Sequence, residues 1–410
     1  MELLAPAGNL EKLYYAYAYG ADAAYIGIKN FSLRARADNF HEDEWKKILD
    51  IKGSKKLYGA LNIFFNNADL KNLETQIDYL SKYPFDAFII SDLGLLPLLK
   101  KYFPNRELHL STQANCTNIE SAGIYQDLGF SRIIPARETS LSEIAEIKNR
   151  FPDLEIEAFV HGAMCMAYSG RCFLSSFLSN RSANKGDCAH TCRWKYKITQ
   201  NPGEIALEEE ERPGEQFPLI DGDTFTTILS SKDHCMIDYL KELRDAGVDV
   251  LKIEGRMKSI YYTAVITRTY RKALEALESG TSSQSWEEYK KELFSVSHRD
   301  FSTGFFFDDE NIQIPTDKSY LRTHLFLGSV GEHVGDGVYK LIVKNQIKAD
   351  SPVEYIGPEI LYKNDAAFTL FDEKMQPVQK ANHGKDFFLK PSTPVQKGYI
   401  LRRKIPHTGI

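Results

Sequence analysis

Short apolar runs alternate with amphipathic stretches along most of the chain before residue 254, and this alternation restricts the possible folds more than any other feature. Apolar runs of this length indicate strands, whereas the stretches between them, such as 9–19 and 72–82, have the spacing of helices. Residue Asn9 is a plausible helix N-cap. The predicted strands are residues 2–5, 23–28, 57–63, 87–91, 108–112, 132–135, 156–160 and 250–253.

Two glycines support this division into units. Gly20 and Gly247 each follow a helical stretch and lead directly into a predicted strand, as a glycine C-cap does. Repeated strand and helix units indicate a parallel α/β sheet, and eight of them fit a closed (β/α)8 TIM-like barrel better than an open sheet. An open doubly wound sheet is the alternative, but the glycine-rich phosphate fingerprint typical of that fold is absent.

Two segments depart from the pattern. Residues 163–230 are rich in Ser, Asn, Gly, Cys and then acidic residues, which predicts a long cysteine-bearing insertion held in place by something such as a metal. Beyond residue 307, apolar runs separated by glycine turns predict a small antiparallel β-barrel. We therefore predict a barrel domain at 1–310 and a C-terminal β-barrel domain at 318–410. Its predicted strands are 325–330, 337–343, 351–356, 367–371 and 391–402.

Charge and the amino terminus limit the class of protein. The formal net charge of -5 argues against a protein that coats nucleic acid by bulk electrostatics, although short basic groups such as 52–56 and 402–404 leave a local basic face open. The first residues have neither a basic flank nor a sustained apolar stretch, so we predict no signal peptide and no membrane anchor. The expected location is cytoplasmic, where structural disulfides are rare.

Five of the six cysteines fall in one segment and need a joint explanation. Thiolates are soft ligands, and four of them complete either a zinc site or an iron–sulfur cluster. The gaps lack the paired Cys-x-x-Cys knuckles of a zinc ribbon, which favours a cluster held by several loops, with zinc or unrelated thiols as alternatives. Cys116 stands apart and is predicted to be an ordinary buried thiol. The clustered cysteines are Cys165, Cys172, Cys188, Cys192 and Cys235.

Polar residues follow the predicted strands repeatedly. In a (β/α)8 barrel the carboxyl ends of the strands meet at one face, where catalytic residues lie. These side chains are therefore expected to share one site. They are Arg34, Arg36, Asn62, Asp92, Gln113, Asn115, Arg137, Glu138, His161, Glu254 and Arg256.

Two common peptidase types are excluded by their motifs. The chain has no His-Glu-x-x-His stretch and no Gly-x-Ser-x-Gly elbow. His161 and Cys165 are four residues apart and could form a thiol protease dyad, which requires an orienting third group. A cysteine peptidase is therefore kept as an alternative.

The segment 157–175, which reads E-x-F-x-x-G-A-M-C and then G-x-C-x-L-S, resembles the signature of the collagenase-like peptidase family. The resemblance extends over nearly the whole barrel and to the C-terminal β-domain. Further matching stretches are 3–9, 31–35, 111–113, 212–214, 231–233 and 252–258.

Similar family members include a prephenate-dependent tRNA wobble-uridine hydroxylase, a ribosomal RNA cytidine hydroxylase, and an iron–sulfur pair that takes part in ubiquinone hydroxylation. Overall length, segment 188–196 and the single trailing β-domain most resemble the tRNA hydroxylase branch. The resemblance implies prephenate-dependent 5-hydroxylation of a tRNA wobble uridine, with the anticodon loop as partner, no membrane, and a homo-oligomer or family heterodimer. A collagenase-like peptidase, or an iron–sulfur hydroxylase acting on ribosomal RNA or a quinone precursor, is the alternative.

The resemblance also implies residue roles. Cys165, Cys172, Cys188 and Cys235 would be ligands of a [4Fe-4S] cluster, and Cys192 is a fifth thiol that could replace Cys188 or Cys235. Because arginine pairs with carboxylates through two parallel hydrogen bonds, arginines at one barrel mouth could bind prephenate, a dicarboxylate. The substrate-binding candidates are Arg34, Arg36, Asn62, Gln113 and Arg256.

Proton transfer and RNA contact have their own candidates. We assign catalytic roles to Glu157, His161 and Arg137, with a structural hydrogen bond as the alternative for Glu157. An RNA base would have to leave its stack to enter the barrel mouth. Segment 193–197 alternates basic and aromatic residues in a way suited to RNA, or Trp194 and Tyr196 belong to the core.

Overall fold

The computed structural model forms two compact units. The first comprises Met1–Tyr17, Ala21–Lys258 and Arg299–Tyr320, and the second comprises Ala18–Gly20, Ser259–His298 and Leu321–Ile410. The residues that the structure describes are 1–29, 31–33, 44–165, 167–193, 206–208, 216–218, 220–222, 225–227, 231–280, 286–307 and 320–405.

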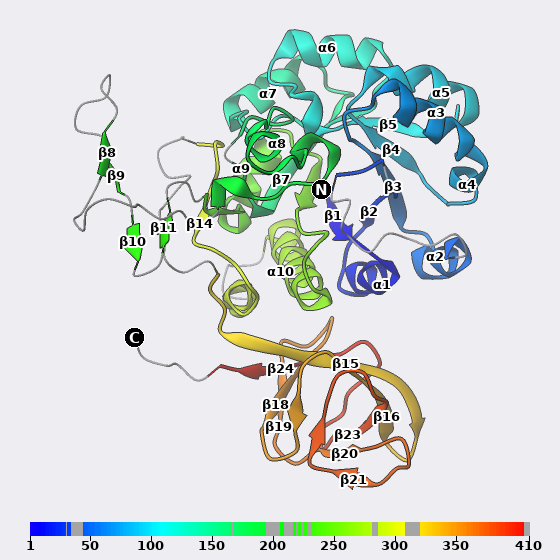
Figure 1. Ribbon diagram of the computed structural model, residues 1–410, viewed down its shortest axis with the longest axis vertical. Helices are drawn as coiled ribbons and strands as arrows, with labels where there is room; N and C mark the ends of the chain where they lie inside the picture. Colours follow the sequence, from blue (N-terminus) through cyan, green and yellow to red (C-terminus); the bar gives the residue numbers. More distant parts are fainter. Residues whose placement is uncertain are drawn as a thin grey trace. The chain divides into compact units, whose positions relative to one another are not determined.

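The first unit contains a closed barrel of eight parallel strands (Figure 1). Each strand pairs with its neighbours in chain order, and β13 closes the ring by pairing with both β1 and β7. All eight predicted strands and the predicted TIM-like barrel are confirmed. The strands are β1 (Glu2–Ala7), β2 (Ala23–Gly27), β3 (Lys56–Leu61), β4 (Ala87–Ile90), β5 (Glu107–Leu110), β6 (Arg132–Ile133), β7 (Glu155–Ala163) and β13 (Val250–Ile253).

Helices surround this barrel (Figure 1). The helix predicted at 9–19 is confirmed, but the single helix predicted at 72–82 is wrong, because the chain leaves helical geometry at Gln76. Buried Leu73, Ile77 and Leu80 keep a helical spacing across this break, so apolar spacing could not reveal it. The helices are α1 (Leu10–Ala18), α2 (Trp45–Lys52), α3 (Asn67–Thr75), α4 (Ile77–Ser81), α5 (Leu96–Tyr102), α6 (Ile119–Asp127), α7 (Leu141–Arg150) and α9 (Leu240–Asp245).

The long segment after β7 contains short elements. β12 (Asp233–Cys235) returns beside β7 in antiparallel register, and β14 (Phe301–Ser302) pairs with β12. Helix α8 (Leu174–Ser179) and η4 (Thr191–Arg193) lie nearer its start. The remaining strands form two hairpins, β8 (Ala206–Glu208) with β9 (Gln216–Pro218) and β10 (Ile220–Gly222) with β11 (Phe225–Thr227).

The barrel interior holds a buried ionic cluster. The Glu157 carboxylate is fully buried, with Oε1 2.6 Å from Lys252 Nζ and Oε2 3.2 Å from Arg132 Nη1. Arg132 also contacts Glu155 at 2.7 Å and Glu2 at 3.1 Å. Burial raises the pKa of the Glu157 carboxyl, but the Lys252 ammonium and the Arg132 guanidinium outweigh burial and hold that pKa below its usual range. The cluster thus joins β1, β6, β7 and β13 inside the barrel.

The second unit contains an eight-stranded antiparallel sheet, in the order β19-β18-β24-β15-β16-β23-β20-β21, and the helices α10 (Ile260–Ser279) and α11 (Glu287–Lys291). The predicted C-terminal antiparallel domain is confirmed. Its strands are β15 (His324–Gly335), β16 (Val338–Val343), β17 (Ile347–Lys348), β18 (Val353–Ile356), β19 (Lys363–Asp365), β20 (Thr369–Phe371), β21 (Pro377–Val378), β22 (Lys380–Ala381), β23 (Phe387–Lys390) and β24 (Ile400–Lys404).

Polar contacts explain one difference from the predicted strands of this unit and the grouping of helix α10. Residues 391–399 are not a strand, because Ser392 is held in a loop by hydrogen bonds of 2.8 and 2.5 Å to the Asp365 carboxylate. Helix α10 groups with the sheet rather than with the barrel strands. Its buried Arg268 donates to the carbonyls of Gly357 and Ile360, at 2.8 and 2.6 Å.

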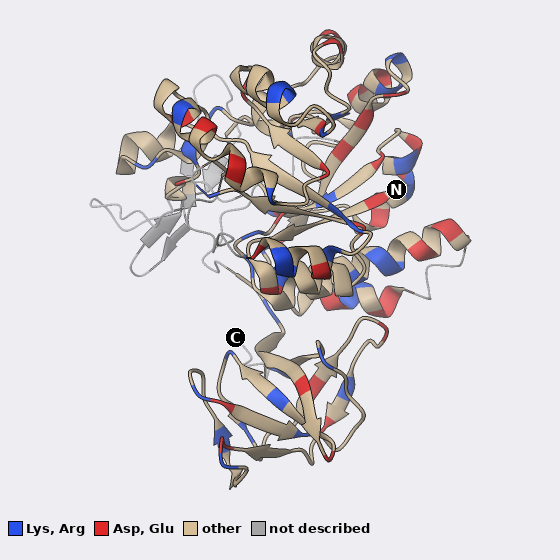
Figure 2. Cartoon of the chain, turned by 90° about the vertical axis from the view of Figure 1, so that its right-hand side faces the viewer, with Lys and Arg blue, Asp and Glu red and all other residues tan. Residues whose placement is uncertain are grey.

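Basic and acidic residues are interspersed along the helices (Figure 2). Some residues of the basic groups noted in the sequence form ion pairs. Lys52 contacts Asp86 at 3.2 Å, and the buried Arg402 contacts Glu354 at 2.8 Å. Within the described ranges, no helix is long and apolar enough to cross a membrane.

Replacing Glu157 with glutamine should destabilise the barrel. Removing one partner of a buried ion pair costs about 3–5 kcal/mol, because the remaining charge stays buried. We expect the free energy of unfolding, measured by urea denaturation, to fall by about that amount. Because folding lowers the pKa of Glu157, its ionised carboxylate stabilises the folded state fully at pH values above the ordinary glutamate pKa of 4.5. This stabilisation is lost as the pH falls through the folded-state pKa.

Glu146→Gln, on the exposed face of α7, is the matched control and should change stability by less than about 0.5 kcal/mol. Because the variant lacks the titrating carboxylate of Glu157, the free energy of unfolding should fall more on acidification in the wild type than in the Glu157→Gln variant. Equal effects of the two substitutions would contradict the assigned role of the buried cluster.

Candidate active site

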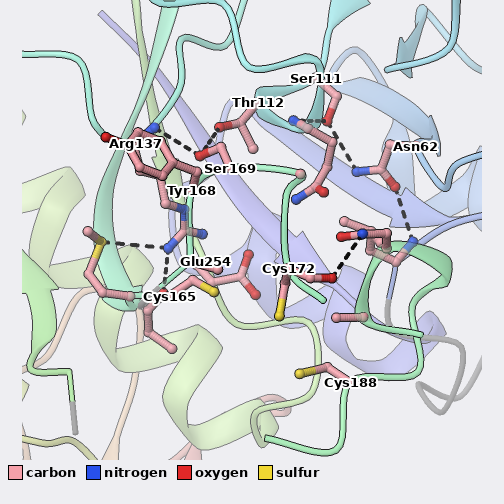
Figure 3. A pocket seen from close by; sticks show the side chains of 18 of the residues that line it. Asn62, Ser111, Thr112, Arg137, Cys165, Tyr168, Ser169, Cys172, Cys188 and Glu254 are labelled. Carbon is pink, nitrogen blue, oxygen red and sulfur yellow. Dashed lines mark hydrogen bonds between the residues drawn. The ribbon is translucent and has the colours of Figure 1, made fainter. Parts of the chain in front are cut away.

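A cavity of about 290 Å³ opens among the residues that follow the barrel strands (Figure 3). Asn62 follows β3, Gln113 follows β5, and Arg137 comes after β6. Cys165 and Arg256 follow β7 and β13. These five predicted residues therefore lie around one cavity, whose volume is close to the lower limit of the roughly 300–1,000 Å³ usual for small-molecule sites.

Among the described residues, three cations line this cavity. Arg137 Nη1 donates to the carbonyl of Ala163 at 2.6 Å, and its guanidinium lies over the Phe159 ring at 4.2 Å. Lys252 comes from within β13 and joins the cavity to the buried cluster below it. Arg256 is buried as well. Glu254 is the one lining carboxylate among the described residues, and Lys252 is already paired with the buried Glu157. Arg137 and Arg256 are therefore the lining cations that favour an anionic ligand.

Arg256 reaches the cavity across a glycine. A Cβ atom built on Gly27, the last residue of β2, would lie 1.9 Å from Arg256 Nη1 and 2.4 Å from Ser32 Oγ. The Arg256 Nη1 atom donates to Ser32 Oγ at 3.3 Å. Any side chain at position 27 would therefore displace the guanidinium.

Asn62 connects the cavity walls. Its Oδ1 accepts a hydrogen bond from the Leu33 amide at 3.1 Å, and its Nδ2 donates to Ser111 Oγ at 3.4 Å. Both polar atoms of the side chain are thus engaged. Asn62 holds the loop after β2 against the end of β5.

A second set of bonds fixes the loop that follows Cys165. Ser169 Oγ accepts from the Arg137 amide at 3.1 Å, and the Ser169 amide donates to Glu138 Oε1 at 2.5 Å. Gly170 has a φ of +73°, and a Cβ atom there would lie 2.2 Å from the Gln113 carbonyl oxygen. Only glycine permits this close approach between the loop and the end of β5.

Four of the clustered cysteines line the cavity, namely Cys165, Cys172, Cys188 and Cys192. The side chains of the first three are drawn in Figure 3. The His190 amide donates to Cys188 Sγ at 3.3 Å, and Asn184 Nδ2 donates to the Cys172 carbonyl at 3.0 Å.

Cys235 is placed differently. It lies in β12, opposite His161 of β7, and is not among the residues that line the cavity. The chemical type of these donors suits an iron–sulfur cluster, because thiolate sulfur is a soft ligand that binds iron and zinc. However, the described part of the chain contains no group of three or more His, Cys, Asp or Glu side chains placed closely enough to hold a metal ion. The arrangement supplies suitable donors but not a preformed ligand set.

The two residues predicted to transfer protons lie behind the cavity. Glu157 belongs to the buried cluster, and His161 is buried with its ring 5.4 Å from that of Phe301. Neither is a lining residue. Arg34 and Arg36 lie outside the described residues, as do Trp194 and the rest of the predicted basic and aromatic stretch except Arg193.

Sequence reasoning missed Lys252 and Tyr168 as lining residues. Lys252 interrupts the apolar run of β13. An isolated charge within a predicted buried strand indicates a functional or paired residue, so the sequence did contain a signal for it. Cys116 matches its prediction. It is buried, and burial raises the pKa of its thiol to about 11, so it stays protonated at neutral pH.

Comparison with known proteins places the chain in a family. Residues 8–314 match peptidase family U32, and residues 322–402 match the C-terminal domain of that family. The chain is 36% identical to tRNA hydroxylation protein P of Escherichia coli, over 87% of this chain and 86% of the relative. It is 35% identical to tRNA hydroxylation protein P of Haemophilus influenzae, over 100% and 97%.

A third relative is the 23S rRNA 5-hydroxycytidine C2501 synthase of Escherichia coli. It is 36% identical to this chain, over 68% of this chain and 40% of the relative. The matches include both the barrel and the C-terminal sheet, and they confirm the resemblance of the signature at 157–175. The chain therefore belongs to peptidase family U32, the collagenase-like family.

Proposed function

We propose that this protein hydroxylates tRNA, and that it converts the wobble uridine to 5-hydroxyuridine in a prephenate-dependent reaction. The relatives named as tRNA hydroxylation proteins, which match most of the chain, support an RNA substrate. The observation that carries the proposal is the composition of the cavity. Cysteine thiols and three cations share one site at the carboxyl ends of the barrel strands.

Prephenate carries two carboxylates, and the cations of the cavity suit them. Arg137 and Arg256 present guanidinium groups, which can each hold a carboxylate through two parallel hydrogen bonds. Lys252 adds a point charge at the base of the cavity. The cation–π contact of Arg137 with Phe159 and the contact of Arg256 with Ser32 fix both groups before a ligand arrives, which lowers the entropic cost of binding.

The uracil base needs a partner for its polar edge. Gln113 lines the cavity with a carboxamide, whose oxygen can accept from N3–H while its amino group donates to a ring carbonyl. Asn62 was predicted to bind substrate, but both of its polar atoms hold neighbouring loops, so we assign it a positioning role. Glu254 is the carboxylate on the lining and can take up a proton at the substrate. The catalytic roles of Glu157 and His161 stay predictions.

The thiols would hold a [4Fe-4S] cluster. Cys165, Cys172 and Cys188 line the cavity and form the core of the proposed ligand set, with Cys235 as the fourth ligand implied by the family resemblance. Cys192 also lines the cavity and is the competing fourth ligand. When bound, such a cluster supplies one-electron transfer.

Deleting the gene tests the proposed reaction. Because the protein would catalyse the hydroxylation of the wobble uridine, we expect 5-hydroxyuridine and nucleosides derived from it to disappear from the tRNA of the deletion strain. Mass spectrometry of tRNA nucleosides measures this, with wild-type complementation as the control. Unchanged hydroxyuridine would contradict the proposal, and cleavage of denatured collagen by the purified protein, abolished in Cys165→Ala, would favour a peptidase.

Purification without air tests the cluster. We expect a brown protein with about four iron and four sulfide per chain, and a large loss of both in Cys172→Ser. Cys116→Ser is the matched control, because that thiol is buried away from the cavity. Comparison of Cys192→Ser with Cys235→Ser identifies the fourth ligand, since only the ligand's loss lowers the iron content. A colourless protein with one zinc per chain would refute the cluster.

Gly27→Ala tests the anion site without touching a cation. The added methyl group should displace the Arg256 guanidinium, so we expect the half-saturating concentration of prephenate to rise about tenfold or more, the usual effect of losing a charged hydrogen bond. Arg256→Met should act similarly, and the double variant should be no worse than either single one. If the effects of Gly27→Ala and Arg256→Met on the half-saturating concentration added up in the double variant, Gly27 would not act through Arg256.

A further inference from the structure

Helix α8 is packed with its polar side inward. Its buried side chain is Ser175, whose Oγ donates to the Arg181 carbonyl at 2.6 Å and accepts from the Ala189 amide at 2.9 Å. By contrast, Phe173 and Phe177 are 73% and 72% exposed. A helix of a globular protein usually buries its apolar side, so packing in this unit does not explain these two rings.

The exposed rings belong to a larger apolar surface. Phe173 and Phe177 lie with centroids 6.4 Å apart and planes inclined by 33°. Leu174 and Leu178 of α8 are exposed as well, and so is Tyr168, which comes earlier in the same segment. Exposed apolar side chains that gather in one segment often mark a binding site. We call these five residues the α8 aromatic patch.

The patch begins at the rim of the candidate active site. Tyr168 and Leu174 belong to both the patch and the cavity lining, and the lining residue Cys172 directly precedes Phe173. Arg171, next to Cys172, is exposed and adds a positive charge. A partner bound permanently on this patch would contact the cavity lining at Tyr168 and Leu174. The occupant is therefore expected to be the molecule whose reacting group enters the cavity.

We propose that the α8 aromatic patch stacks the unpaired bases that flank the nucleotide entering the cavity. This inference rests on the proposed function and adds how the RNA is held. A base that leaves its stack deprives its neighbours of a stacking partner, and flat aromatic rings replace that partner for any base. Arg171 is placed to contact the adjoining phosphate. The patch thus selects single-stranded loops over duplex RNA.

Fluorescence anisotropy with a labelled anticodon stem-loop that carries an unmodified wobble uridine tests this inference. We expect Phe173→Ala/Phe177→Ala to weaken binding at least about fivefold, the lower limit for loss of one base stacked on an aromatic ring. Phe173→Leu/Phe177→Leu should weaken it similarly, because leucine keeps the apolar area but lacks a flat face. Phe173→Tyr/Phe177→Tyr should keep wild-type affinity.

Tyr102→Ala, at an exposed ring on α5 outside the cavity, is the matched control and should bind normally. The salt dependence of binding should be the same in all variants, because stacking releases no counterions. Because both rings are highly exposed, these substitutions should leave the fold intact, and circular dichroism verifies this.

The outcomes separate this inference from the proposed function. If the wild type modifies tRNA but the alanine variant binds the stem-loop equally well, the patch inference fails and the proposed function stands. If the wild type neither binds the stem-loop nor supports hydroxyuridine formation, both fail. Unchanged RNA affinity together with a shift from dimer to monomer in sedimentation velocity would also overturn the inference, and would assign the patch to a second copy of the chain.

Discussion

The contact between Glu157 and Lys252 inside the barrel is the interaction on which the site depends. It joins β7 to β13, the pair that closes the ring, and Arg132 extends it to β6. Burial of one charge alone would be costly, so the three groups are stable only together. The same contact positions the Lys252 ammonium at the base of the cavity. Closure of the barrel and the position of Lys252 at the cavity therefore depend on the same contact.

The cavity combines cationic side chains with cysteine thiols. Its base is cationic and anchored by the barrel, whereas its thiols lie on the segment that follows β7. That segment is fixed by short polar bonds, such as those of Ser169 to Arg137 and Glu138, and by the approach of Gly170 to Gln113. A ligand bound by the cations would thus lie next to the sulfur atoms, as the proposed hydroxylation requires.

Helix α8 extends this arrangement outward. It carries Leu174 and Ser175 at the cavity and two aromatic rings on its exposed side. A small anion and an RNA base could then approach the same site by different contacts, charge for the first and stacking for the second. The membership of the chain in peptidase family U32 identifies the scaffold, and the residues around the cavity determine its chemistry.

The sequence by itself determined the barrel, its eight strands and the strand-end position of Asn62, Gln113, Arg137 and Arg256, because buried parallel strands leave a periodic apolar pattern and their carboxyl ends share one face. Only the tertiary structure decided that Glu157 belongs to an interior ion cluster, that Lys252 lines the cavity, and that Cys192 lies on the lining while Cys235 does not. Those placements depend on which strands meet across the barrel and how the long insertion returns. Contacts between residues so distant along the chain leave no local pattern, since each side chain's partner is set by the folded geometry.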